Sequence, residues 1–164
     1  MNSRQPKWGK MLSLQELNDE RDIQRVYSIY CDIIDDKDFD RLTEIFTDDA
    51  WQDYRQTLGP TGLMQGTVPL IAGAKIHMGE GSYCGQTHHN VMNFRISVTD
   101  DTATAKVHYY AVHRGVGKHE GALYSMWGEY DDQLIRTEDG WRVKYRMYRS
   151  FMTEGPVVTF KDDA

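Results

Sequence analysis

The residues best suited to chemistry lie in the segment Gln86–Asn93, which contains the adjacent pair His88 and His89. Well upstream, a predicted helix carries Tyr30 and Asp35. Histidine titrates near working pH, and a carboxylate that fixes its tautomer makes it an effective general base. If the fold brings Asp35 and His89 together, the chain can transfer protons without a metal or a cofactor.

The composition is typical of a soluble protein with one domain. The 164 residues are 40% hydrophobic and 27% charged, which is sufficient for one substantial core. A net charge of −6 argues against a nucleic-acid surface. No apolar run approaches the roughly 20 residues that span a bilayer. Residues 1–10 lack the apolar region of a signal peptide, so we expect a cytoplasmic protein that binds neither membrane nor nucleic acid.

The cysteine and histidine patterns contain no metal motif. Cys31 and Cys84 are too few and too far apart for a disulfide framework or a thiolate metal site. The six histidines contain no HExxH spacing, and no glycine-rich phosphate loop or G-x-S-x-G elbow is present. We therefore expect no metal and no cofactor.

The elements that must position these residues are helices followed by strands. Ser13 and Glu16 fit a capping box, which predicts a helix starting near Leu14. We expect one domain over 1–164, with residues 1–11 as a loose arm and residues 152–164 as a tail.

Two further helices are predicted, over 39–46 and 68–78, with a short strand at 51–55 between them and a loop at 57–67. The second half alternates over 90–99, 104–114, 122–136 and 141–151, which predicts a meander of long strands. The order predicts an α+β fold, most simply a curved sheet wrapped around about three helices.

Several short motifs occur in this same order. They are Ile23–Tyr30 with Asp35 beyond it, Phe46–Ala50, Gln86–His89 with Asn93, and Asp139–Val143. In this order they resemble the SnoaL-like branch of the NTF2-like superfamily across residues 20–150. The resemblance implies a cone-shaped α+β barrel, with a mixed or antiparallel sheet, whose interior is a ligand pocket.

The resemblance also implies roles for individual residues. Relatives such as scytalone dehydratase, hexachlorocyclohexane dehydrochlorinase and a bile-acid dehydratase use a histidine to remove a proton and an aspartate to orient it. By position, His89 matches the histidine, Asp35 the aspartate and Tyr30 a tyrosine of the dehydratases. His108 lies about where scytalone dehydratase has a second histidine.

Simple periodicity favours other roles for two of these residues. Asp35 lies well away from the centre of the apolar helix face, so it is alternatively one of a solvated cluster of aspartates. His89 shares strand parity with polar residues, whereas His88 shares parity with Met92, Phe94 and Ile96. A bulge or bend near Asn90 would reverse this parity and turn His89 inward.

The remaining candidates for substrate contact are aromatic or basic side chains. Each has a structural alternative, as core packing or as part of a solvated strand face. Arg146 in particular belongs either to the basic solvated face of the last strand or to a pocket. The candidates are Trp51, Tyr54, His108, Tyr124, Trp127 and Arg146.

The sequence therefore predicts a cofactor-independent lyase of the dehydratase type that acts on a small cyclic or aromatic-like substrate. A cyclase or isomerase with the same dyad is an alternative, as is a non-catalytic binding module or a dioxygenase small subunit. Because such relatives assemble through the outer sheet face, the resemblance also implies a homo-oligomer, a trimer or a dimer.

Overall fold

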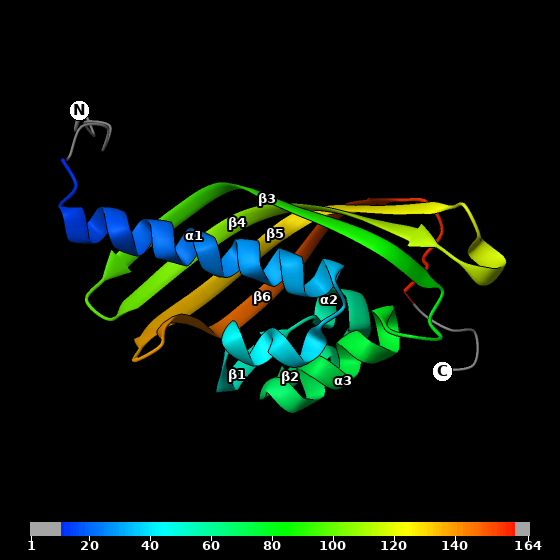
Figure 1. Ribbon diagram of the computed structural model, residues 1–164, viewed down its shortest axis with the longest axis horizontal. Helices are drawn as coiled ribbons and strands as arrows, with labels where there is room; N and C mark the ends of the chain where they lie inside the picture. The colour runs from blue at the N-terminus through cyan, green and yellow to red at the C-terminus, as the bar shows by residue number, and fades with distance from the viewer. Residues whose placement is uncertain (1–10, 160–164) are drawn as a thin grey trace.

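The computed structural model describes residues 11–159, which form a curved sheet with helices on one side (Figure 1). Most of the expected N-terminal arm and the end of the C-terminal tail lie outside this range. The helices are α1 (Leu14–Asp35), η1 (Phe39–Glu44), α2 (Arg55–Leu58), η2 (Gly59–Gly62), α3 (Thr67–Met78) and η3 (Gly117–His119). The strands are β1 (Phe46–Asp53), β2 (Leu63–Gln65), β3 (Cys84–Thr99), β4 (Thr102–Gly115), β5 (Leu123–Thr137) and β6 (Gly140–Glu154).

The six strands form one mixed sheet in the order β2-β1-β6-β5-β4-β3. All neighbours pair antiparallel except β1 and β6, which are parallel. The α+β architecture expected from the sequence is confirmed, but β2 and β3 remain edges, so the sheet is open and does not close into a barrel. Figure 1 shows α1 lying lengthwise along the sheet, with β1, β2 and α3 gathered beneath it.

The helix α1 begins at a complete capping box. The Ser13 hydroxyl accepts a hydrogen bond from the Glu16 backbone N–H, and the Glu16 carboxylate accepts one from the Ser13 backbone N–H. These bonds satisfy donors that a helix start otherwise leaves free. The helix packs an apolar face on the sheet through residues such as Ile23, Tyr27 and Ile33, all fully buried.

Strands β3 and β6 each contain more than one shift in pairing, and two of these bulges bear on which side chains reach the site. In β3 the pairing with β4 shifts between Met92 and Arg95, and Asn93 adopts a positive φ of 54°. In β6 the pairing with β5 shifts next to Val143. One extra residue in a strand reverses the alternation of its side chains. Residues on the two sides of each bulge therefore follow opposite alternation patterns.

The boundaries differ from the sequence expectation mainly in the middle of the chain. The first strand starts at Phe46 rather than near residue 51, because it pairs with β6 from that residue. The expected loop at 57–67 contains two short helical turns and β2. The last strand continues to Glu154, so the tail begins later than residue 152. Over residues 11–159, no helix combines the length and apolar character needed to cross a membrane.

Candidate active site

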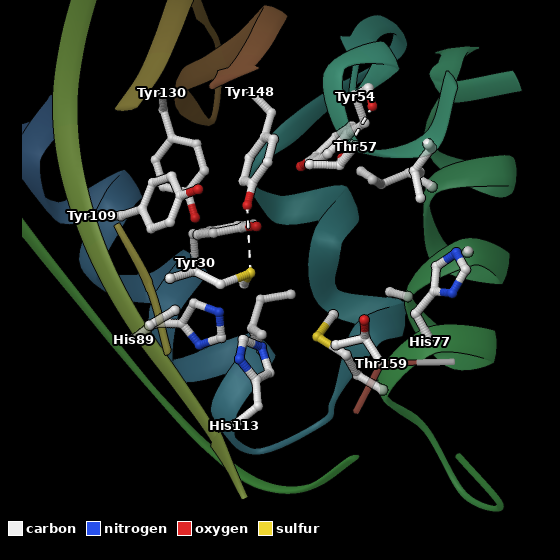
Figure 2. A pocket seen from close by; sticks show the side chains of 18 of the residues that line it. Tyr30, Tyr54, Thr57, His77, His89, Tyr109, His113, Tyr130, Tyr148 and Thr159 are labelled. Atoms are coloured by element: carbon white, nitrogen blue, oxygen red, sulfur yellow. Dashed lines mark hydrogen bonds between the residues drawn. The ribbon is translucent and has the colours of Figure 1, made fainter. Parts of the chain in front are cut away.

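A cavity of about 320 Å³ lies between the sheet and the helices (Figure 2). The sheet contributes histidines and tyrosines to its wall, and the helices contribute mostly aliphatic side chains. Its lining comprises Tyr30, Ile34, Leu42, Tyr54, Thr57, Leu58, Met64, Leu70, Gly73, Ala74, His77, Met78, His89, Tyr109, Ala111, His113, Tyr124, Met126, Tyr130, Tyr148, Val157 and Thr159. This size is at the lower end of the range of small-molecule sites.

Asp35 and His89 are in direct contact at the cavity wall. The Nδ1 atom of His89 lies 2.7 Å from Oδ1 of Asp35. The backbone N–H of His89 donates to Oδ2 of the same carboxylate at 2.8 Å, and the Thr87 hydroxyl donates to Oδ1 at 2.8 Å. With Nδ1–H bonded to the carboxylate, Nε2 of His89 is the nitrogen left for a ligand in the cavity.

These hydrogen bonds also set the charge of Asp35. Burial acts to raise the pKa of its carboxyl, but the bonds from the side chain and backbone of His89 and from Thr87 outweigh it. The pKa is consequently lower than usual, so the carboxylate is ionised at neutral pH. A fixed negative charge next to Nδ1 stabilises an imidazolium when Nε2 takes a proton.

The neighbouring His88 faces solvent. Its side chain is 75% exposed, against 7% for His89, and its Nδ1 lies 3.6 Å from Oδ2 of Asp35. The bulge at Asn93 explains the difference from simple alternation. Val91 packs on the core before the bulge and Phe94 after it, whereas Met92 is 40% exposed, contrary to the expectation that Met92 shares the inner face with Phe94.

His113 is a second buried histidine of the site that was not among the predicted residues. It lies on β4, and its ring is perpendicular to that of His89 with centroids 5.3 Å apart. Burial first, and then the electrostatic effect of the neighbouring His89, lower the pKa of His113 to about 4, so it is neutral at pH 7. One signal was available: His113 shares strand parity with Val107, Tyr109 and Ala111, which form the apolar face of β4.

Tyrosines form the other polar part of the wall. Tyr109 stacks on Tyr130 at 4.8 Å and on Tyr148 at 5.3 Å, and Tyr54 stacks on Tyr148 at 5.0 Å. Burial, followed by the electrostatic effect of Tyr54, raises the pKa of Tyr30 well above its usual value. Tyr30 therefore keeps its proton and can donate a hydrogen bond to an oxygen in the cavity.

Arg146 does not line the cavity, and it does not lie on the solvated basic face either. The bulge near Val143 turns it inward, where it is fully buried. Its Nε and Nη2 atoms donate to Asp132, and the closest of these distances is 2.8 Å. Its guanidinium carbon lies 4.5 Å from the ring centre of Tyr30 and 4.1 Å from that of Tyr130. Arg146 thus contacts two tyrosines of the wall without lining the cavity itself.

Three other predicted contact residues also lie outside the cavity, whereas Tyr54 and Tyr124 line it. His108 is on the outer face of β4, near Asn93 and Glu129. Trp127 stacks on Tyr110 on the same outer face, and Trp51 is 39% exposed on β1. The expectation that these three form the pocket wall is corrected because strand alternation points them away from the helices. Within residues 11–159, no group of three or more metal-ligating side chains is present.

The fold and the site together define an α+β protein with a cavity whose wall carries a histidine–aspartate pair. Residues 15–147 match the model of the SnoaL-like domain. The chain therefore belongs to the SnoaL-like family.

Relatives of known sequence or structure cover nearly the whole chain. Rv2910c, an uncharacterized protein of Mycobacterium tuberculosis, is 31% identical over 142 residues, 84% of this chain and 88% of the relative. A candidate scytalone dehydratase from Novosphingobium aromaticivorans superposes with a TM-score of 0.73 at 22% identity, covering 91% of this chain and 97% of the other. A type 2 hexachlorocyclohexane dehydrochlorinase, LinA, gives a TM-score of 0.72 at 18% identity, with coverages of 90% and 95%. At these identities the structural similarity establishes the fold.

Proposed function

We propose that this chain is a cofactor-independent lyase that eliminates water from a small cyclic substrate, with His89 as the general base. The observation that carries the proposal is the 2.7 Å contact between Nδ1 of His89 and the Asp35 carboxylate, at the wall of a largely apolar cavity. An open cavity next to such a pair is expected for an enzyme. A purely structural subunit needs neither. The similarity in fold to a candidate dehydratase and a dehydrochlorinase supports the same class of reaction.

In the proposed step His89 accepts a proton from the substrate and later donates the same proton to the leaving group. Nε2 of His89 removes a proton from a substrate carbon, and the C–H electrons form a C=C bond while the adjacent C–O bond breaks. Asp35 stabilises the imidazolium that forms. Nε2 then returns the proton to the departing hydroxide, which leaves as water, so His89 is neutral for the next cycle.

Protonated tyrosines supply hydrogen bonds to the substrate oxygens. Tyr30 and Tyr54 line the cavity and donate to a carbonyl oxygen or to the leaving hydroxyl in this proposal. His113, which is neutral and beside His89, is a further donor or acceptor in the same wall.

Proton exchange in deuterium oxide tests the general base without knowledge of the natural substrate. A set of cyclic ketones, beginning with 2-tetralone, is incubated with the protein, and loss of the α-proton signals is followed by NMR. We expect exchange faster than in buffer, reduced on the order of 100-fold or more by His89→Gln. The matched control is His88→Gln, which changes the exposed neighbour and should leave the rate unchanged. Equal rates for the parent protein and His89→Gln across the set would favour a non-catalytic binding module.

A further inference from the structure

The helix α3 presents a stripe of five residues to the cavity. Leu70, Gly73, Ala74, His77 and Met78 all line it, and their spacing of three and four residues places them on one face of the helix. The two smallest side chains lie at the centre of this stripe, between larger ones at both ends. The side chains that α3 contributes to the cavity wall are therefore smallest at Gly73 and Ala74.

The glycine in this stripe is not required by the backbone or by close packing. A Cβ atom added at Gly73 would have no heavy atom within 4 Å, and its φ is not in the left-handed region. Glycine in a helix interior is about 0.8–1.0 kcal/mol less favourable than alanine. The missing side chain thus destabilises α3 locally and leaves open space in the cavity.

The charge of the wall restricts what can occupy this space. None of the described lining residues is Lys, Arg, Asp or Glu. The charges behind the wall are already paired: Asp35 is bonded to His89, and Arg146, which is fully buried, is paired with Asp132. An anion or a cation in the cavity would lose its hydration without gaining an opposite charge, which is costly. An uncharged ligand with a few oxygen atoms meets both the tyrosines of the sheet and the aliphatic side chains of α3.

We propose that Gly73 determines substrate specificity: the space in front of it holds the apolar ring system of an uncharged substrate whose reactive edge faces His89. The inference rests on the proposed function, because it uses His89 to orient the substrate. It adds that the residue at position 73 limits the width of the ring system, whereas the dyad determines the chemistry.

Binding of neutral phenols of increasing width tests the inference without catalysis. Phenol, 2-naphthol and 9-phenanthrol are titrated into the parent protein, Gly73→Leu and Gly73→Ala by calorimetry. We expect Gly73→Leu to weaken binding of the two wider rings at least about tenfold and that of phenol much less, because the added side chain occupies the same space. Gly73→Ala should give an intermediate effect, and because it restores helix propensity it guards against misfolding of the leucine variant.

Ala72→Leu is the matched control, because Ala72 is exposed on the same helix. It should leave all three affinities unchanged. 2-Naphthoate, the anion of similar shape to 2-naphthol, should bind at least tenfold more weakly. The inference is overturned if the parent binds none of the neutral rings, if 2-naphthoate binds as tightly as 2-naphthol, or if Gly73→Leu weakens the three phenols equally. The same probes are also titrated into His89→Gln. If this variant binds them with the same dependence on ring width, the binding inference stands even where the proposed catalysis fails.

Discussion

At the scale of single residues, the chemistry depends on how many hydrogen bonds Asp35 accepts. Its two oxygens accept from the Thr87 hydroxyl, the His89 backbone N–H and Nδ1–H of His89. An asparagine has one acceptor oxygen and would direct its N–H₂ group at a donor. The carboxylate is thus needed both for its charge and for its number of acceptors.

We predict that Asp35→Asn lowers the exchange rate of cyclic ketones on the order of 100-fold. We also expect it to destabilise the fold by about 1–3 kcal/mol, because one donor near the carboxylate loses its partner. The ¹⁵N NMR shifts of the His89 ring report the tautomer, and the parent protein should carry its proton on Nδ1. A parent protein with Nδ1 unprotonated, or an Asp35→Asn variant with unchanged exchange, would contradict the dyad.

His113 gives a second prediction at this scale, one that concerns stability. Its pKa is about 4 in the folded protein and about 6.5 when unfolded, so between these values the unfolded chain binds a proton that the folded chain does not. Stability therefore falls as the pH falls through this window. The loss between pH 7 and pH 5 is about 2 kcal/mol.

Urea unfolding at pH 7 and pH 5 measures this loss. The parent protein should lose about 2 kcal/mol more than His113→Gln, because the variant has no group that titrates at this position. His119→Gln, on η3 and outside the cavity lining, is the control variant, and it should lose as much stability between pH 7 and pH 5 as the parent. The same pH dependence in His113→Gln as in the parent would show that His113 is not held neutral by its surroundings.

At the scale of elements, bulges decide which residues reach the site. Helix α1, its capping box and the meander of long strands followed from hydrophobic periodicity and turn residues. Strand alternation put His108 and Tyr109 on opposite faces of the same strand, but it left open which of these faces was the pocket, and the choice of His108 as a contact residue was wrong. It could not locate the extra residue in β3 or in β6, because a bulge depends on pairing with a neighbouring strand. His89 and Arg146 both lie beside such bulges, so their orientation was not predictable from alternation.

The bulge in β3 can be tested at Asn93, whose φ of 54° is in the left-handed region. Asn93→Val should destabilise the protein by about 1–2 kcal/mol, because a β-branched residue is strained there. Asn93→Gly should be tolerated, since glycine adopts this conformation readily. Thermal or urea unfolding measures both, with Met92→Val on the exposed face of the same strand as control. A valine variant as stable as the parent would mean that the strand does not need this bulge.

At the scale of the whole molecule, a buried polar group connects the helix layer with the sheet. The Tyr27 hydroxyl on α1 donates to Asp132 of β5 at 2.9 Å, and Asp132 pairs with Arg146 of β6. Arg146 also lies over the rings of Tyr30 and Tyr130, which line the cavity, although Arg146 itself does not. The same cluster therefore holds α1 on the sheet and fixes two tyrosines of the candidate site.

Removing one partner of this pair should be costly, because it leaves an unpaired buried charge. We predict that Arg146→Met destabilises the fold by about 3–5 kcal/mol, and that adding Asp132→Leu recovers much of the loss. Arg149→Met is the matched control: it removes an exposed pair with Asp131 on the same two strands and should cost less than about 1 kcal/mol. Urea unfolding of the four proteins forms the comparison. If the double variant is no more stable than Arg146→Met, the cost lies in lost packing around Tyr30 and Tyr130. In that case the unpaired buried charge would not explain why the contact between α1 and the sheet is sensitive to substitution.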